Sequence, residues 1–285
     1  MSIWNDISWV EGIRTPFLNY FFYNISLTGY PIFLFLFLAF GYFFWSPQRF
    51  SRVAMLLFIS AVINSFLKDF FQDPRPPAEF MLDEGTGMSY GWPSGHAQIA
   101  VTLWGLLAYE LKNKFITLSA IVFISLVAFS RMYLGVHDLG DVFAGLMIGG
   151  FILLIWHYAI LNNIYEKFSS RSWFLIVLTF QLIAYMLYPT HEGHEISFWL
   201  LGAMAGWFLG ASNINISTQK IYKFLISASS TVAVFFTMIF LFQLEGSLEL
   251  IGFVSILYSY SLGLIFSIFV SWVIPRFWKI LRLAE

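Results

Sequence analysis

Long apolar runs, separated by short polar breaks, fill most of the chain from residue 30 onward. Nine of these runs have about the length, roughly 17 to 25 residues, that a helix needs to cross the hydrocarbon core of a bilayer. They cover residues 30–46, 52–70, 95–111, 116–134, 138–160, 173–189, 198–212, 224–244 and 250–274. The breaks are too short to hold a soluble domain. The pattern therefore predicts an all-α, polytopic transmembrane helical bundle with about nine spans.

The segment that precedes the first run, residues 1–29, follows a different pattern. It is aromatic but interrupted by Pro16, Asn19 and Asn24. We expect it to lie in the membrane interface, with a full span as the alternative. It has no basic leader followed by a short apolar stretch and a cleavage site, so we expect no removable signal peptide.

Basic residues alternate between the polar breaks. One set of breaks, together with the carboxyl end, holds Arg49, Arg52, Lys112, Lys114, Lys167, Arg171, Lys220, Lys223, Arg276, Lys279 and Arg282. The intervening breaks hold only Lys68, Arg75 and Arg131 as basic residues. Because cytoplasmic loops gather Lys and Arg, we expect the amino terminus outside and the carboxyl terminus inside.

Composition supports a membrane protein and excludes several classes of site. Of the 285 residues, 59% are hydrophobic and only 11% are charged, whereas a soluble domain carries about 25% charge. No basic tract accompanies the net charge of −1, so we expect no nucleic-acid partner. The chain has no cysteine, which excludes disulfides, zinc–thiolate sites and thiol catalysis.

Two polar clusters lie on the predicted outer face at the ends of apolar runs. In "KDFFQDPRPP", Lys68 and Arg75 supply two cations, and the prolines hold Arg75 on a stiff, extended segment. In "WPSGHAQ", we expect Ser94 to cap a helix and Gly95 to let the backbone approach a ligand, with His96 following directly. The free N–H groups of that first turn form a ready anion site.

The third cluster, "SRMYLGVHDLGDV", lies between the fourth and fifth predicted helices, on the same predicted outer face. Arg131 ends one helix and His137 begins the next. Asp141 follows His137 by four residues, so it lies one turn along the same helix face. Its carboxylate can accept a hydrogen bond from the N–H of one ring nitrogen, which leaves the other nitrogen as a nucleophile. Alternatively, the pair makes a structural hydrogen bond only.

Together the three clusters supply three cations, a helix amino terminus and two histidines in different surroundings. Phosphoryl transfer needs this set, because cations and N–H groups stabilise the charge on the phosphoryl oxygens in the transition state. One histidine would attack while the other protonates the leaving oxygen. We expect neither a metal nor another cofactor. Taken singly, each cation could instead be a side chain that snorkels at a helix end.

The order and spacing of these residues resemble the three-part signature of the type 2 phosphatidic acid phosphatase (PAP2) family. The resemblance implies that His137 is the nucleophile that forms a phosphohistidine, that Asp141 orients it and that His96 is the general acid. It also implies that the phosphate is bound by Lys68, Arg75, Ser94, Gly95 and Arg131. The family has a six-helix core, so we expect residues 1–29 to form an interfacial segment, 30–160 a PAP2-like catalytic core and 161–285 additional transmembrane helices.

We therefore expect a lipid phosphatase that hydrolyses a lipid phosphomonoester or a polyprenyl or other lipid diphosphate at the outer membrane face. Two alternatives stay open: a lipid phosphotransferase with the same site, and a non-catalytic lipid-phosphate binder or transporter. The expected partners are the lipid substrate and membrane lipids. We expect a bacterial inner membrane with the site facing the periplasm, and endoplasmic reticulum is the alternative. Substrate choice and oligomeric state stay open.

Other features receive structural interpretations. We interpret the spacing of Gly145 with Gly149, and of Gly202 with Gly206 and Gly210, as surfaces where helix backbones approach closely. The stretch "HEGHE", residues 191–195, has the side chains for a zinc or copper site but not the helical HExxH pattern. We interpret Asp138 as a solvated helix cap. We interpret the acids Glu79, Asp83 and Glu84 as part of an exposed loop, and the Phe and Trp residues as side chains that face lipid.

Overall fold

The computed structural model of the chain describes residues 4–86, 89–187, 194–210, 220–248, 250 and 252–281. These residues form helices and connecting loops without any β-strand, so the all-α fold class is confirmed. Two compact units account for the chain. The first comprises residues 1–33 and 59–162, and the second comprises residues 34–58 and 163–285. The expected division of the chain into an interfacial segment (1–29), a catalytic core (30–160) and additional helices (161–285) stays a prediction.

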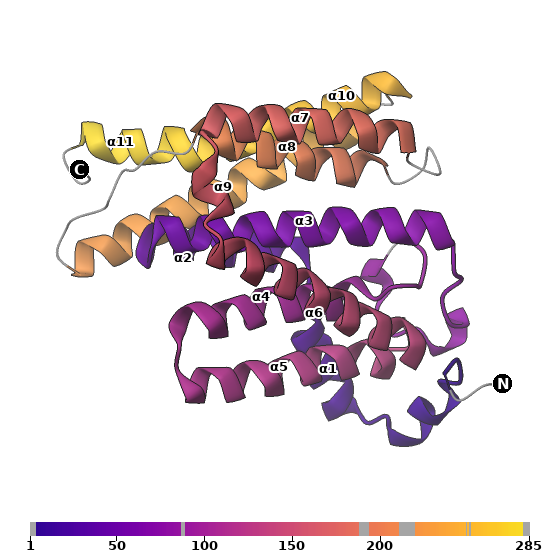
Figure 1. Cartoon of the computed structure of the whole chain (residues 1–285). Coiled ribbons are helices and arrows are strands. Elements are labelled where there is room, and N and C mark those ends of the chain that lie inside the picture. The colour runs from indigo at the N-terminus through magenta and orange to yellow at the C-terminus, as the bar shows by residue number, and fades with distance from the viewer. Residues whose placement is uncertain are drawn as a thin grey trace. The chain divides into compact units, whose positions relative to one another are not determined.

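The first unit contains the helices that carry every candidate site residue. Its helices are the 3-10 turn η1 (Ser8–Ile13), α1 (Pro16–Leu27), the carboxyl half of α3 (Pro47–Phe71), the short turns η2 (Ala78–Phe80) and η3 (Glu84–Thr86), α4 (Gly95–Leu111), α5 (Lys114–Tyr133) and α6 (Leu139–Leu161). Helices α4, α5 and α6 lie side by side, and α1 packs on α5 (Figure 1). The candidate site lies where α3 and α5 end and where α4 and α6 begin.

Side-chain caps fix the starts of three of these helices, α1, α5 and α6. Thr15 accepts a hydrogen bond from the backbone N–H of Leu18 at the start of α1, and Pro16 occupies the first helical position. Asn113 accepts hydrogen bonds from two backbone N–H groups at the start of α5. At the start of α6, Asp138 and Asp141 form a reciprocal capping box. Such caps bind N–H groups that have no partner within the helix.

Two glycines of α6 bring that helix against α4. A Cβ atom on Gly149 would lie 2.7 Å from the carbonyl oxygen of Gln98, and one on Gly145 would clash with the carbonyl oxygen of Ser94. The predicted close approach of helix backbones at this glycine pair is therefore confirmed. The contact holds the start of α4 next to the start of α6, and it thereby positions the candidate site.

A buried polar network joins α3 to α4 below the site. Gln98 is fully buried, and its amide nitrogen donates to the backbone oxygen of Ser60 at 2.7 Å. Asn64 donates to the Gln98 side-chain oxygen at 2.9 Å and to the carbonyl of Pro93 at 3.2 Å. Because buried amides are costly without partners, this network fixes the register between the two helices.

The second unit contains the remaining helices. They are most of α2 (Pro31–Phe44), the amino half of α3, η4 (Ile164–Lys167), α7 (Ser170–Leu187), α8 (His194–Gly210), α9 (Lys220–Ser247), α10 (Phe253–Ile268), the π-helical turn η5 (Phe269–Val273) and α11 (Ile274–Ile280). Gly202 and Gly206 of α8 face the backbone of α10, and Gly210 faces the Ser271 side chain of η5. The predicted packing role of these glycines is confirmed as well.

The predicted number of spans is not confirmed. Five helices of the described residues are long and apolar enough to cross a membrane: Pro47–Phe71, Lys114–Tyr133, Leu139–Leu161, Ile221–Leu244 and Phe253–Ile280. Helices α1 and α2 count as a sixth span only if their pair, bent by 55°, is taken together. Two further apolar helices, Ser170–Phe180 and Ser197–Gly210, are shorter. Among the described residues, helices that are long and apolar enough to span a membrane are therefore fewer than the nine apolar runs.

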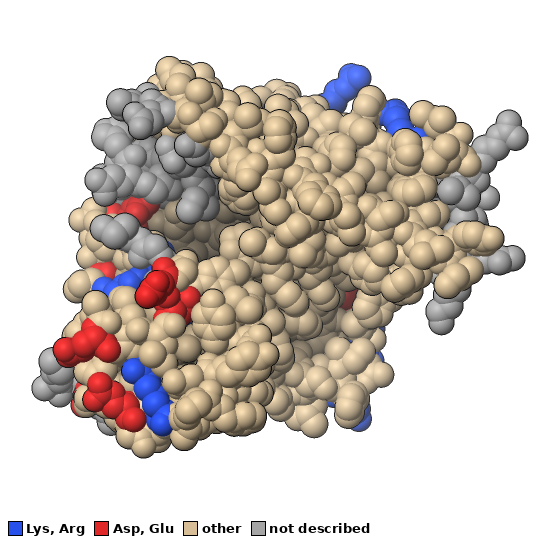
Figure 2. All heavy atoms as spheres, turned by 180° about the vertical axis from the view of Figure 1, so that it is seen from behind, with Lys and Arg blue, Asp and Glu red and all other residues tan. Residues whose placement is uncertain are grey.

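The surface agrees with a protein embedded in lipid. Figure 2 shows a face on which most of the described surface carries neither acidic nor basic side chains. The exposed residues of α5 and α6 include Phe115, Leu118, Phe151 and Leu154, each at least 60% exposed. Large apolar side chains in such number do not face water in soluble proteins. The chain is therefore an integral membrane protein.

Candidate active site

The three predicted clusters meet at one end of the first unit. Lys68 lies in the last turn of α3, and Arg75 follows in the loop after it. Arg131 lies in the last turn of α5, and His137 lies in the loop that leads to α6. The backbone N–H of Ser94 donates to the carbonyl oxygen of Asp141 at 3.0 Å, which ties the second cluster directly to the third.

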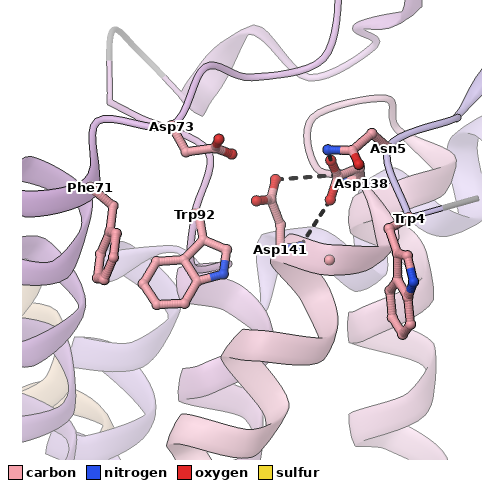
Figure 3. A pocket seen from close by; sticks show the side chains of 8 residues that line it. Trp4, Asn5, Phe71, Asp73, Trp92, Asp138 and Asp141 are labelled. Carbon is pink, nitrogen blue, oxygen red and sulfur yellow. Dashed lines mark hydrogen bonds between the residues drawn. The ribbon is translucent and has the colours of Figure 1, made fainter. Parts of the chain in front are cut away.

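His137 and Asp141 make the predicted contact, although His137 lies in the loop before α6 and does not begin the helix as predicted. Nδ1 of His137 lies 2.9 Å from Oδ2 of Asp141, and both side chains are 2% exposed. The same carboxylate oxygen accepts a hydrogen bond from the backbone N–H of Asp138 at 3.3 Å (Figure 3). A carboxylate at Nδ1 favours the tautomer whose proton lies on that nitrogen. The lone pair of His137 is then on Nε2.

The other ring nitrogen of His137 faces a cation. Nε2 lies 3.4 Å from Nη1 of Arg75. Burial, together with the nearby charges of Lys68 and Arg75, holds the pKa of His137 well below its ordinary value of 6.5. At neutral pH the imidazole is therefore uncharged, which is the form that can act as a nucleophile.

Arg75 is held in a fixed orientation by the chain around it. Nη1 donates to the carbonyl of Val136 at 2.9 Å, Nε donates to the carbonyl of Ser89 at 2.6 Å, and Nη2 donates to the Ser89 hydroxyl at 2.8 Å. Burial and the charge of Arg131 lower the pKa of Arg75 to about 10, so the guanidinium stays charged at neutral pH. Its fork is thus oriented before any substrate arrives.

Lys68 joins the end of α3 to the segment that precedes α4. Its Nζ atom donates to the carbonyl oxygens of Tyr90 and, at 2.9 Å, Gly91. These residues lie shortly before Ser94. Lys68 therefore places its charge next to the second cluster.

Arg131 makes an ion pair that the sequence did not predict. Its Nη1 atom lies 2.8 Å from Oδ2 of Asp83 and also contacts the Ser26 hydroxyl. The Tyr30 hydroxyl donates to the same carboxylate at 2.8 Å. Asp83 is 1% exposed, so its interpretation as part of an exposed loop was wrong. Burial acts to raise the pKa of Asp83, but Arg131 and the Tyr30 hydrogen bond hold it below 3.8.

The interpretation of Asp138 as a solvated cap was half right. Its Oδ1 atom accepts the backbone N–H of Asp141 at 2.9 Å, as a helix cap does. Its Oδ2 atom accepts a hydrogen bond from the Asn5 side chain at 3.1 Å. The residue is only 8% exposed, because the amino-terminal segment covers it.

The start of α4 holds its polar side chains differently from the prediction. Ser94 occupies the N-cap position, but its side chain makes no capping hydrogen bond, so that part of the prediction was wrong. The ring of His96 packs edge-on against Tyr30, with centroids 4.8 Å apart. A Cβ atom on Gly29 would collide with the same imidazole. The segment between α1 and α2 therefore fixes the position of His96.

Buried donors without a protein partner come from the start of α4 and the end of α5. They are Oγ of Ser94, Nε2 of His96, and Nε and Nη2 of Arg131. A buried donor without a partner costs about 1–3 kcal/mol, so four such atoms indicate a ligand that accepts several hydrogen bonds. A phosphate group has the required oxygens and the opposite charge to the cations. Both His96 and His137 also interact electrostatically with the charges of Lys68, Arg75 and Arg131.

No metal centre competes with this interpretation among the residues that the structure describes. Within them, no group of three or more His, Cys, Asp or Glu side chains is close enough to hold a metal ion. The other candidate, "HEGHE", falls at residues 191–195, of which residues 191–193 lie outside the described part and the side chains of 194–195 are not described.

Comparisons with known proteins match the same region. The family model described as "PAP2 superfamily" matches residues 49–165, which include every candidate site residue. The chain is 30% identical to a lipid A 4'-phosphatase from Porphyromonas gingivalis, over 53% of this chain and 71% of that protein. It is 28% identical to the dihydrosphingosine 1-phosphate phosphatase YSR3 from Saccharomyces cerevisiae, over 56% of this chain and 43% of that protein. The chain thus spans less than half of the yeast relative.

A solved structure also resembles part of the chain. It is the PAP2 type phosphatidylglycerolphosphate phosphatase from Bacillus subtilis, which is 25% identical and has a TM-score of 0.49. The likeness covers 57% of this chain and 84% of that protein.

Proposed function

Because the chain belongs to the PAP2 superfamily, we propose that it hydrolyses the phosphate ester of a membrane lipid through a phosphohistidine on His137. The substrate is a lipid phosphomonoester or a lipid diphosphate. One observation carries the proposal: the Nδ1 atom of His137 lies 2.9 Å from Asp141, while Nε2 lies 3.4 Å from the Arg75 guanidinium. In that arrangement the neutral ring nitrogen that would attack lies next to a cation that would bind the phosphate.

The first step transfers the phosphoryl group to the protein. The Nε2 lone pair of His137 forms a bond to phosphorus while the bond between phosphorus and the lipid oxygen breaks. His96 gives its proton to that leaving oxygen. Asp141 stabilises the positive charge that develops on the His137 ring. The lipid leaves as an alcohol, or as a monophosphate when the substrate is a diphosphate.

The second step restores the enzyme. The oxygen of a water molecule forms a bond to phosphorus, and the bond between phosphorus and Nε2 of His137 breaks. His96, now neutral, takes the proton of the water. The products are inorganic phosphate and the free enzyme.

The remaining site residues would hold the phosphoryl oxygens through both steps. Lys68, Arg75 and Arg131 supply positive charge, and Ser94 supplies a hydroxyl donor. Gly95 is the first residue of α4, where backbone N–H groups are free to donate to an anion. These groups are fixed in place before the substrate binds, so they stabilise the transition state without reorganisation.

We assign the site to the outer face of the membrane. The alternation of basic residues along the sequence supports this orientation, and a bacterial inner membrane with a periplasmic site fits it. The lipid would enter sideways between helices, so that its headgroup reaches His137 while its chains stay in the bilayer.

Phosphate release from a panel of lipid phosphates by the purified chain, with EDTA present, tests the proposal. We expect release to survive chelation, to vanish in His137→Ala and to persist in His157→Ala. His157 is a suitable control because it lies in α6 against Tyr109, with ring centroids 4.9 Å apart, and belongs to none of the three clusters. Label that moves to an added acceptor lipid rather than to water would instead identify a phosphotransferase. Saturable binding without turnover would identify a binder and contradict the proposal.

A further inference from the structure

A cavity of about 290 Å³ opens beside the candidate active site. We call it the acidic pocket, and its main lining residues are Asp73, Asp138, Asp141, Trp4, Phe71 and Trp92. Figure 3 shows the three carboxylates around the middle of the pocket, with Phe71 and Trp92 on one side and Trp4 on the other. None of the lining residues is Lys, Arg or His. The pocket is therefore negative, although it borders a site built from three cations.

Asp141 joins the acidic pocket to the active site. Its Oδ2 atom holds His137, whereas its Oδ1 atom is buried and has no hydrogen-bond partner. In Figure 3 this second oxygen points to the side of the pocket where Asp73 and Trp92 lie. A buried carboxylate oxygen without a donor is costly. It indicates a ligand that brings a donor, and preferably a positive charge, into the pocket.

The charges around the pocket also favour a positively charged ligand. Burial and, to a smaller extent, the negative charge of Asp138 raise the pKa of Asp73 above its ordinary value of 3.8, while the charge of Lys68 acts in the opposite direction. The three carboxylates do not converge closely enough to bind a metal ion, since the described residues contain no such group. Carboxylates that surround a space of this size suit a larger organic cation.

The aromatic rings favour the same kind of ligand. Phe71 and Trp92 pack edge-on with ring centroids 4.4 Å apart, and Trp4 lies on the other side of the pocket (Figure 3). The faces of aromatic rings attract ammonium groups, and Trp does so most strongly. Rings combined with carboxylates thus form a site for an ammonium group attached to apolar carbon.

We propose that the acidic pocket binds an ammonium group carried by the lipid phosphate substrate, so that the preferred substrate is an amino-lipid phosphate. The inference rests on the proposed function and narrows its substrate class. Cations on one side of Asp141 and carboxylates on the other complement a headgroup that has both a phosphate and an ammonium group. A neutral or purely anionic headgroup would leave the acidic pocket without a partner.

A pair of substrates that differ only in charge tests this inference. The first is a long-chain 2-amino-alkyl 1-phosphate, and the second is its N-acetyl derivative, both presented to the full chain in a detergent without amines. We expect kcat/KM to be about tenfold higher for the amine, as one favourable ammonium site provides. In Asp73→Asn the ratio of the two kcat/KM values should fall toward one. Glu79→Gln removes the same charge from an exposed position in η2, within the same segment between α3 and α4, and it should keep the wild-type ratio.

Three results would overturn the inference in distinguishable ways. A wild-type ratio near one, or a ratio that Asp73→Asn leaves unchanged, refutes the ammonium pocket while the phosphatase activity stands. If added phosphatidylethanolamine alters the rates of both substrates equally while the substrate amine has no effect, a neighbouring lipid headgroup occupies the pocket instead. Release from neither of the two lipids nor from a diacylglycerol phosphate contradicts the proposed function, and the inference falls with it.

Discussion

The guanidinium of Arg131 lies 2.8 Å from the carboxylate of Asp83, and the two side chains are 0% and 2% exposed. They come from segments 48 residues apart in sequence. The pair leaves Nε and Nη2 of Arg131 buried without a partner. Asp83 thus holds one side of the guanidinium, and the rest of it remains available to a phosphate group.

Asp83→Asn should therefore lower activity by misplacing Arg131. The amide keeps the shape of the carboxylate but removes its charge, so Arg131 becomes a buried cation without a counterion. We expect kcat/KM to fall about a hundredfold, the size of effect that a small misplacement of a catalytic group produces. The free energy of unfolding should fall by about 3 kcal/mol. Steady-state kinetics and thermal unfolding in detergent measure the two effects.

Glu84→Gln is the matched control for this variant. Glu84 is the next residue and is exposed, so its neutralisation should change stability by less than about 0.5 kcal/mol. Equal effects of the two substitutions, or none in either, would show that Asp83 does not position Arg131.

The cations near His137 should affect the pH dependence of activity, because they lower the pKa of its imidazole. The pKa of His137 lies well below 6.5 because of burial and the charges of Lys68 and Arg75. The acidic limb of the kcat/KM profile should therefore lie below pH 6.5. Arg75→Gln removes one of these cations, so the pKa of His137 rises and the acidic limb should move up by about one pH unit. A limb that stays in place or moves down would contradict the assignment of His137 as the nucleophile.

The same shift in the pKa of His137 affects stability. Below pH 6.5 the unfolded chain binds a proton at His137 that the folded chain does not bind. The free energy of unfolding therefore decreases as the pH falls from 6.5 toward the lowered pKa of the folded state. Thermal unfolding of wild type and His137→Gln between pH 7 and pH 5 should show a smaller loss of stability in the variant. An equal loss in both would exclude His137 as its source.

The contact between α4 and α6 gives a prediction about the backbone that carries the site. Gly149→Ala would place a Cβ atom 2.7 Å from the Gln98 carbonyl oxygen, and the two helices would have to move apart. We expect a loss of stability of about 1–3 kcal/mol and a lower kcat, because Ser94 and His96 would shift away from Asp141. Thermal unfolding and kinetics measure both.

The neighbouring glycine provides the control. A Cβ atom on Gly150 would meet nothing within 4 Å, and alanine favours helix by up to about 1 kcal/mol over glycine. Gly150→Ala should therefore keep full activity and equal or slightly higher stability. If Gly149→Ala behaves in the same way, the close approach of α4 and α6 does not position the site.

Motifs at helix ends were predictable from the sequence, and long-range partners were not. His137 and Asp141 are four residues apart at a helix start, so their hydrogen bond was expected from the sequence, although His137 lies just before the N-cap residue Asp138. Asp83 lies in an irregular loop, where an acid that faces water and one that is buried against a distant arginine give the same local pattern. Only the folded chain brings Asp83 to Arg131.

The acidic pocket was missed for a similar reason. Trp4 and Trp92 lie 88 positions apart by their residue numbers, and each on its own is typical of a tryptophan at a membrane interface. Their shared cavity depends on how the amino-terminal segment packs over α6, through the hydrogen bond between the Gly140 N–H and the Trp4 carbonyl at 3.2 Å. The nine predicted spans were not confirmed among the described residues, because an apolar run does not by itself give the length of the helix that it forms.

Capture of the phosphorylated enzyme tests the central claim most directly. The chain is mixed rapidly with a lipid substrate whose phosphate is radiolabelled, quenched in base, and digested so that the labelled residue can be located by mass spectrometry. We predict a label that is stable to base and labile to acid, located on His137, and absent from His137→Ala. Phosphate release at the full wild-type rate without such a label, or a label on another residue, would contradict the phosphohistidine mechanism.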